Sequence, residues 1–316
     1  VQLTVERNGN SLSFTVKRQK IEVPVVSSSV LTGGIGYIKL SSFSDDADER
    51  FAEQLAKLEQ KQIRALLIDL RDNPGGIVDT ARNIAAQFIA EGTLMHAYDR
   101  NGKDVPVTIS DGRTVKYPVV LLVNGGSASA SEVLAGALQD YGKATVVGEK
   151  TFGKGSVQTV YALPSGGGLK MTTEHYFTPQ KHKVDKVGIT PDIVAEGGTV
   201  QMVTALRAAG AGELKVDVSA QSVVVNGASF YDNVPVVRQE GRVFAPVRLL
   251  AAMASVPVEW IESERAVVTG DGERIKFSEG NGFLMYGSTG LADVQLFSER
   301  YPQLKWSVTE NELSLE

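Results

Sequence analysis

The 316 residues contain no cysteine and only three histidines. The missing cysteines exclude disulfides, thiolate zinc sites and a cysteine nucleophile. No apolar run approaches the length that a membrane-spanning helix needs, and no basic-then-apolar signal segment opens the sequence. A net charge of −5 argues against nucleic acid as the main partner. With so few histidines, a Ser-His-Asp triad is less attractive than a serine paired with another base.

What the sequence does contain is a run of alternating strand and helix patterns. Strands are expected at residues 36–40, 65–70, 119–123 and 144–148, and helices at 47–60, 78–90 and 129–141. The segment ALLIDL (65–70) is almost continuously apolar, as expected for a strand buried on both faces. This alternation predicts an α/β core, and residues 156–177 then alternate as strands.

The two ends of the sequence differ from this core. Residues 1–7 and 11–18 predict a hairpin around Asn8-Gly9, and we expect the sequence to start inside a larger protein. After a short helix at 202–208, strands follow with turns at Asn226-Gly227, Gly241 and Asp271-Gly272, interrupted by one helix at 247–254. Residues 213–316 hold 9 basic and 15 acidic side chains, a charge of −6 that leaves about +1 elsewhere. We therefore place a domain boundary near residue 212.

The first candidate for chemistry is the turn GGSASASE (125–132), between a buried strand and a helix. Unpaired N–H groups and the helix dipole favour negative charge there, which suits the oxyanion of an acyl transfer by Ser129. The alternative is structural, because Ser129-x-x-Glu132 is also a capping box.

The second candidate is GEKTFGKG (148–155), which resembles a phosphate-binding loop. Gly155 stands where that loop needs a hydroxyl, and a strand pattern follows in place of a helix, so both features argue against nucleotide. A lysine can act as a base where burial lowers its pKa toward neutrality, and Lys154 is the candidate. The alternative is an exposed lysine on a flexible turn.

The third candidate is Asn73-Pro74-Gly75-Gly76, directly after a buried strand. Glycine permits a backbone N–H to approach an oxyanion closely, although a simple tight turn is the alternative. His96, His175 and His182 lie outside all three turns, and His175 is expected to pack or to face solvent.

Together these turns resemble the C-terminal processing (tail-specific) protease family. The resemblance covers roughly residues 20–195 and rests on LIDLRDNPGG (67–76), on VNGGSASASEVLAGALQDYGKATVVGEKTFGKGSVQ (123–158), and on HYFTP (175–179) with GITPDI (188–193). It implies Ser129 as nucleophile, Lys154 as general base and Gln158 as the residue that orients the lysine. It also implies an oxyanion hole formed by the N–H groups of Ala130 and Gly75. No metal-ligand cluster is visible in the sequence, so we expect no metal and no cofactor.

The resemblance further implies a crotonase-like α/β core with a cap region and a PDZ domain. We expect residues 1–18 to be a PDZ remnant, 19–211 the protease core and cap, and 212–316 a smaller, mostly β domain. The segment 226–268 resembles the copper amine oxidase N-terminal-like module, yet the tail has no histidine or cysteine, the preferred copper ligands. For this tail, surface attachment, dimerisation, binding of a regulatory partner and an inert spacer all stay open.

The expected function is that of a serine endopeptidase that cleaves proteins or peptides outside the cytoplasm, secreted or membrane-anchored in a Gram-positive bacterium. The alternative is a catalytically silent scaffold that keeps the fold and binds peptides. Intact Ser129, Lys154 and Gln158 favour the enzyme.

Overall fold

The computed structural model describes residues 1–17, 24–220, 222–230, 232–264, 266–270 and 275–316. At its centre is a six-stranded sheet with the order β12-β9-β8-β5-β4-β3, parallel except for β3. Its strands are β3 (Val26–Leu31), β4 (Ile35–Leu40), β5 (Ala65–Asp69), β8 (Val119–Val123), β9 (Thr145–Gly148) and β12 (Ile193–Val194). Every residue of β5 and β8 is buried, which confirms the α/β core and the prediction for ALLIDL.

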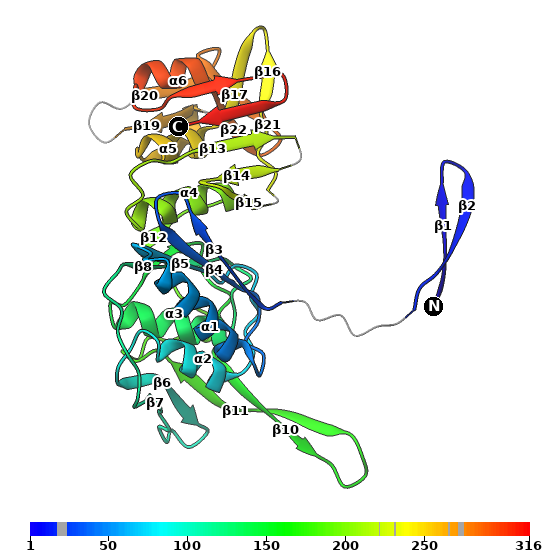
Figure 1. The fold of residues 1–316 in the computed structure, drawn as a ribbon, viewed down its shortest axis with the longest axis vertical. Coiled ribbons are helices and arrows are strands. Elements are labelled where there is room, and N and C mark those ends of the chain that lie inside the picture. Colours follow the sequence, from blue (N-terminus) through cyan, green and yellow to red (C-terminus); the bar gives the residue numbers. More distant parts are fainter. Residues whose placement is uncertain (18–23, 221, 231, 265, 271–274) are drawn as a thin grey trace.

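Helices cover both faces of this sheet (Figure 1). On one face lie α1 (Ala47–Gln60), α2 (Val78–Ala85) and α3 (Ala130–Asp140), and on the other lies α4 (Gly198–Ala208). Neighbouring residues of a strand point to opposite faces, so Leu66 joins the core beneath α1 to α3 whereas Leu67 joins the core beneath α4.

A second, four-stranded sheet lies beside the helices, with the order β10-β11-β6-β7. Its strands are β6 (Gly92–Asp99), β7 (Val107–Ile109), β10 (Ser156–Ala162) and β11 (Gly168–Phe177). The strands β10 and β11 form an arm that extends away from the body of the molecule (Figure 1). This confirms the prediction of strands within 156–177.

The C-terminal part holds two antiparallel or mixed sheets. Five strands are ordered β15-β14-β13-β24-β23 and seven are ordered β16-β17-β22-β21-β20-β19-β18. The first sheet contains β13 (Val216–Ser219), β14 (Val223–Val225), β15 (Ala228–Phe230), β23 (Trp306–Val308) and β24 (Glu312–Leu315). The second contains β16 (Val237–Gln239), β17 (Arg242–Pro246), β18 (Val258–Ile261), β19 (Ala266–Thr269), β20 (Ile275–Glu279), β21 (Gly282–Tyr286) and β22 (Thr289–Asp293). The helices are α5 (Val247–Ala254), the 3-10 turn η1 (Glu262–Glu264) and α6 (Val294–Arg300).

The N-terminal hairpin of β1 (Gln2–Arg7) and β2 (Asn10–Thr15) forms a separate two-stranded sheet. Asn8 and Gly9 both have positive φ, 53° and 75°, as the predicted hairpin turn requires. All residues of both strands are exposed, and the hairpin stands apart from the rest in Figure 1. The expected end of this unit, Arg18, lies outside the described residues, as does the Asp271-Gly272 turn.

Two helix predictions were wrong in detail, and one helix was not predicted. Helix α2 ends at Ala85 and not near residue 90, where the carbonyl of Ala86 accepts the N–H of Arg113 in place of a donor from the next helical turn. Helix α4 starts at Gly198, a turn before the predicted start. A second C-terminal helix, α6, was not predicted; the carboxylate of Asp293 caps it by accepting the N–H of Leu296 at 3.1 Å.

Candidate active site

Ser129 occupies the sharp turn between β8 and α3. Its backbone has φ 55° and ψ −115°, a conformation that costs energy in any residue with a Cβ atom. The turn leaves the residue half-exposed, whereas Ala128 and Ala130 on either side are buried. Observed strain of this kind clusters at functional sites, so the geometry favours a role for Ser129 beyond helix capping.

Gly75 comes into close contact with this turn. A Cβ atom at Gly75 would lie 2.8 Å from the Cβ of Ser129 and 2.8 Å from the backbone N of Ala130. No side chain fits there, so glycine is required by space as well as by its φ of 99°. The structure therefore brings together the first and third candidate turns of the sequence.

The two predicted oxyanion donors differ in their surroundings. The N–H of Ala130 belongs to the first residue of α3 and has no partner within the helix. The N–H of Gly75, in contrast, donates to Oδ1 of Asn73 at 2.9 Å. A role for Gly75 in an oxyanion hole stays a prediction, and it requires this hydrogen bond to open or to be shared.

Asn73 fixes the position of the Gly75 turn. It is fully buried, and its amide donates to the carbonyl of Leu40 at 2.8 Å. Its own carbonyl accepts the N–H of Ala128 at 3.0 Å and the hydroxyl of Ser131 at 2.9 Å. The Asn-Pro-Gly-Gly turn is thus joined to both sides of Ser129.

Lys154 lies in the loop between β9 and β10, and it is half-exposed. A Cβ atom at the neighbouring Gly155 would lie 2.2 Å from the backbone N of Asp185. The loop is joined to the serine turn by the N–H of Phe152, which donates to the carbonyl of Ser127 at 3.0 Å. The second candidate turn therefore lies beside the other two.

A buried carboxylate joins the serine turn to the lysine loop. Oε2 of Glu132 accepts the N–H groups of Ser129 at 2.9 Å and of Lys154 at 2.8 Å. Oε1 accepts the hydroxyl of Thr151 at 2.6 Å and the N–H of Gly153 at 2.7 Å. Glu132 is 0% exposed, so four donors within the protein take the place of water. The capping interaction read from the sequence is present, but the same carboxylate also positions the predicted base.

Tyr176 makes a second link between the same two segments. Its hydroxyl contacts the carbonyl of Lys154 and lies 3.2 Å from the carbonyl of Ser129. Burial raises the pKa of Tyr176, and the negative charges of Glu132 and Asp185 raise it further. The hydroxyl therefore stays protonated and acts as a donor.

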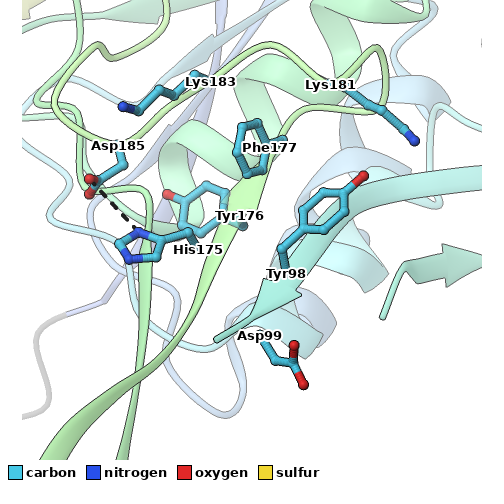
Figure 2. A pocket seen from close by; sticks show the side chains of 8 residues that line it. All are labelled: Tyr98, Asp99, His175, Tyr176, Phe177, Lys181, Lys183 and Asp185. Carbon is cyan, nitrogen blue, oxygen red and sulfur yellow. Dashed lines mark ion pairs between the residues drawn. The ribbon is translucent and has the colours of Figure 1, made fainter. Parts of the chain in front are cut away.

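Tyr176 also lines a cavity of about 470 Å³ at the base of the arm (Figure 2). His175 lies there with its Nδ1 3.8 Å from a carboxylate oxygen of Asp185, and its side chain is 55% exposed. Of the two environments expected for His175, packed or facing solvent, the structure has the second. His96 and His182 contact Asp104 and Asp140 instead. Within the described ranges, no hydrogen bond joins a histidine to Ser129.

Gln158 lies on β10 and is exposed. Across the part of the chain that the structure describes, no hydrogen bond connects the side chains of Ser129, Lys154 and Gln158. Glu132 positions the backbones of Ser129 and Lys154 together, but the assignment of the three residues as nucleophile, base and orienting residue stays a prediction.

One ion pair near the site was not predicted from the sequence. Arg71 forms two hydrogen bonds with the carboxylate of Asp69, at 2.9 and 2.6 Å. Burial opposes the charge of Asp69, but the hydrogen bonds and charge of Arg71 outweigh burial and lower the pKa of Asp69. Arg71 also donates to the carbonyl of Gly198 at 3.0 Å. Because Arg71 comes just before the Asn-Pro-Gly-Gly turn, this pair connects that turn to α4.

The described residues contain no group of three histidine, aspartate or glutamate side chains arranged to hold a metal ion. Among the same residues, no helix has both the length and the apolar character needed to cross a membrane.

Comparison with known proteins identifies the family. Residues 34–195, just over half the chain, match the family described as Peptidase family S41. The chain belongs to peptidase family S41. Residues 171–269 match the family described as Copper amine oxidase N-terminal domain, which begins well before the predicted domain boundary at 212. Both resemblances seen in the sequence are thereby confirmed.

Relatives of this S41 chain include processing proteases of bacteria. It is 42% identical over 187 residues to a carboxyl-terminal-processing protease of Synechocystis, covering 58% of this chain and 44% of that protein. It is 35% identical over 242 residues to the carboxy-terminal processing protease CtpB of Bacillus subtilis, covering 73% and 50%. Among solved structures, the photosystem II D1 C-terminal processing protease matches with a TM-score of 0.52 and 32% identity, covering 59% of this chain and 52% of that one. The chain spans half or less of the length of these two curated relatives.

Proposed function

We propose that this chain is a serine endopeptidase in which Ser129 is the nucleophile and Lys154 the general base. The observation that carries the proposal is the Glu132 carboxylate, which accepts the backbone N–H groups of both residues. A buried, fully bonded carboxylate is costly to place, and here its effect is to hold these two segments in fixed register. Membership of a peptidase family supports the same chemistry.

In the proposed reaction, the Oγ of Ser129 attacks the carbonyl carbon of the scissile bond and its proton passes to Nζ of Lys154. The N–H groups of Ala130 and Gly75 stabilise the oxyanion. Collapse of the intermediate expels the amine, which takes the proton from Lys154. Water, deprotonated by the same lysine, then attacks the ester carbonyl, and the lysine returns the proton to Oγ of Ser129 as the C–Oγ bond breaks. Gln158 orients the lysine amine after the side chains rotate into hydrogen-bonding distance, which the glycines beside Lys154 permit.

The substrates proposed are proteins or peptides outside the cytoplasm, and the core is proposed to be crotonase-like with a cap region. We assign the β1–β2 hairpin to a PDZ domain. Its apolar side chains Leu3, Val5, Leu12 and Phe14 are 39–50% exposed and share one face, because Leu3 pairs with Phe14 and Val5 with Leu12. The remainder of such a domain would cover this face.

Cleavage of casein by this chain, compared with its Ser129→Ala variant, tests the proposal. Cleavage that disappears in the variant is the expected result. Casein that stays intact with both proteins, while an unfolded peptide still binds, would support the alternative of a silent peptide-binding scaffold. Cleavage that survives Ser129→Ala would contradict the assignment of the nucleophile.

A further inference from the structure

Strand β10 forms a free edge directly beside the candidate site. It lies at the end of the sheet order β10-β11-β6-β7 and pairs with β11. It begins at Ser156, two residues after Lys154. A strand at the edge of a sheet presents a row of backbone N–H and C=O groups to any other strand.

The groups that face this free edge can be identified. The carbonyl of Gly155 accepts the N–H of Tyr176, and the N–H of Leu163 donates to the carbonyl of Gly167, so Gly155 and Leu163 face β11. The register of the β10–β11 pair shifts between Val157 and Gln158, where Thr173 of β11 has no partner on β10. The extra residue lies on β11, so the alternation along β10 is unbroken. Since backbone groups alternate in direction along an antiparallel strand, the residues facing outward are Ser156, Gln158, Val160 and Ala162.

This edge lacks two of the features with which proteins block unwanted pairing. Its seven residues, SVQTVYA, contain no charge and no proline, although edge strands commonly carry them. Tyr161 pairs with Leu169, and both are exposed by 46–48% on one face of the arm. Val160, which belongs to the other face, is 65% exposed. The edge therefore offers main-chain hydrogen bonds flanked by apolar surface on each side.

We propose that β10 is the docking strand for substrate, and that an extended, unfolded polypeptide segment pairs with its free edge as an additional strand. The proposal rests on the proposed peptidase function and specifies its substrate class: segments without secondary structure, uncharged along the paired stretch, with apolar side chains alternating along the strand. Main-chain hydrogen bonds supply affinity with little dependence on sequence, and the flanking surface selects the alternate side chains.

A substrate strand is favoured over a second copy of the chain because of where the edge begins. A strand paired from Ser156 outward starts beside Lys154, whose N–H shares Oε2 of Glu132 with that of Ser129. Pairing between two copies would occupy the stretch of edge nearest to the half-exposed Ser129. Substrate could then no longer pair with this stretch. A scissile bond can therefore be held here only when no second copy occupies the edge.

The test measures binding in the Ser129→Ala background, so that it does not depend on hydrolysis. The probe is a fluorescein-labelled peptide of about ten residues, longer than β10, with alternating valine and serine and a lysine at each end. Fluorescence anisotropy gives its Kd. Val160→Pro removes one outward N–H, and proline is tolerated at the open side of an edge strand. Val160→Ala, the matched control, removes nearly the same side chain but keeps that N–H.

Val160→Pro is expected to raise Kd about tenfold, because one hydrogen bond to the peptide is lost and the adjoining one is displaced. Val160→Ala should raise Kd less than about threefold. The same peptide with N-methyl groups on alternate residues should bind about tenfold more weakly to the unmodified arm. This second measurement does not depend on how the proline variant folds.

Equal affinity for the parent and N-methylated peptides would overturn the proposal. So would a chain that dimerises in sedimentation, becomes monomeric with Val160→Pro and keeps its peptide affinity, because β10 would then pair two copies. Casein cleavage that is absent, or that survives Ser129→Ala, would contradict the proposed function and would leave the peptide-binding result unaffected. The two failures are therefore distinguishable.

Discussion

Replacing Glu132 by glutamine tests how the serine turn and the lysine loop are held together. The side chains have nearly the same shape, but a glutamine amide offers one acceptor oxygen where the carboxylate offers two. Two of the four donors that converge on Glu132 must then face an NH₂ group. A hydrogen bond to a charged group contributes about 1.5–3 kcal/mol, so we expect the free energy of unfolding to fall by roughly 3 kcal/mol after partial relaxation.

The effect on catalysis follows from Oε2, which holds the N–H groups of Ser129 and Lys154. If one of these bonds acts on the transition state, its loss of about 1.5–3 kcal/mol lowers kcat about 10- to 150-fold. Casein or peptide cleavage under single-turnover conditions, well below the melting temperature, measures this change. KM should stay nearly constant, because the carboxylate is buried and does not reach substrate.

Thr151→Val is the matched control for Glu132→Gln. It removes the hydroxyl donor to Oε1 at 2.6 Å and the acceptor for the N–H of Ile189 at 2.7 Å, but leaves both Oε2 bonds in place. It should lower the melting temperature while changing kcat less than about threefold. A folded Glu132→Gln enzyme whose kcat stays within about threefold of the parent value would show that the Oε2 bonds do not act on catalysis.

Further predictions concern the base, the cofactor requirement and acid stability. Lys154→Ala should abolish cleavage with a normal melting curve, and Lys154→Arg should also fail because arginine stays protonated; unchanged turnover in either would exclude Lys154 as the base. EDTA should leave cleavage unchanged and ATP should not bind at the Lys154 loop, as checked by activity and by calorimetry. The Arg71 contacts lower the pKa of Asp69 despite its burial, so its contribution to stability is complete above its unfolded pKa of about 3.9 and is lost as pH falls through the lowered value. Asp69→Asn should therefore be destabilised at neutral pH and show a smaller acid-induced drop in thermal melts taken between about pH 7 and about pH 3; an unchanged acid limb would contradict this.

Much of the core could be predicted because its signals are local. The buried strand at 65–70 and the amphipathic helix at 47–60 each follow from their own residues, and the structure has them as β5 and α1. Helix α2 shows the limit, because its end depends on Arg113, which lies far along the sequence. Helix α6 was missed although Asp293 is a good capping residue, since strand patterns surround its seven residues.

The candidate site was predicted as three turns, but the groups that join them were not. In the sequence Glu132 is recognisable only as part of a capping box, and nothing there indicates that Thr151 and Gly153 share its carboxylate. Tyr176 lies in the HYFTP motif, yet its contact with the Ser129 carbonyl joins residues that are 47 positions apart in the sequence. These roles depend on long-range contacts, which neither periodicity nor local motifs encode.

The C-terminal part shares a buried core with the central sheet of the peptidase core. Leu67 and Val120 of the central sheet belong to the same buried cluster as Val225 and Leu250 of the C-terminal part, so unfolding one side would expose apolar surface of the other. A polar contact also joins the two parts, because Asp232 of the C-terminal part accepts the N–H of Thr199, at the start of α4, at 2.8 Å. Arg71 bonds the carbonyl of the adjacent Gly198 and leads directly into the Asn-Pro-Gly-Gly turn. Loss of the C-terminal part would therefore remove contacts of α4, and through Arg71 it would reach the backbone that approaches Ser129.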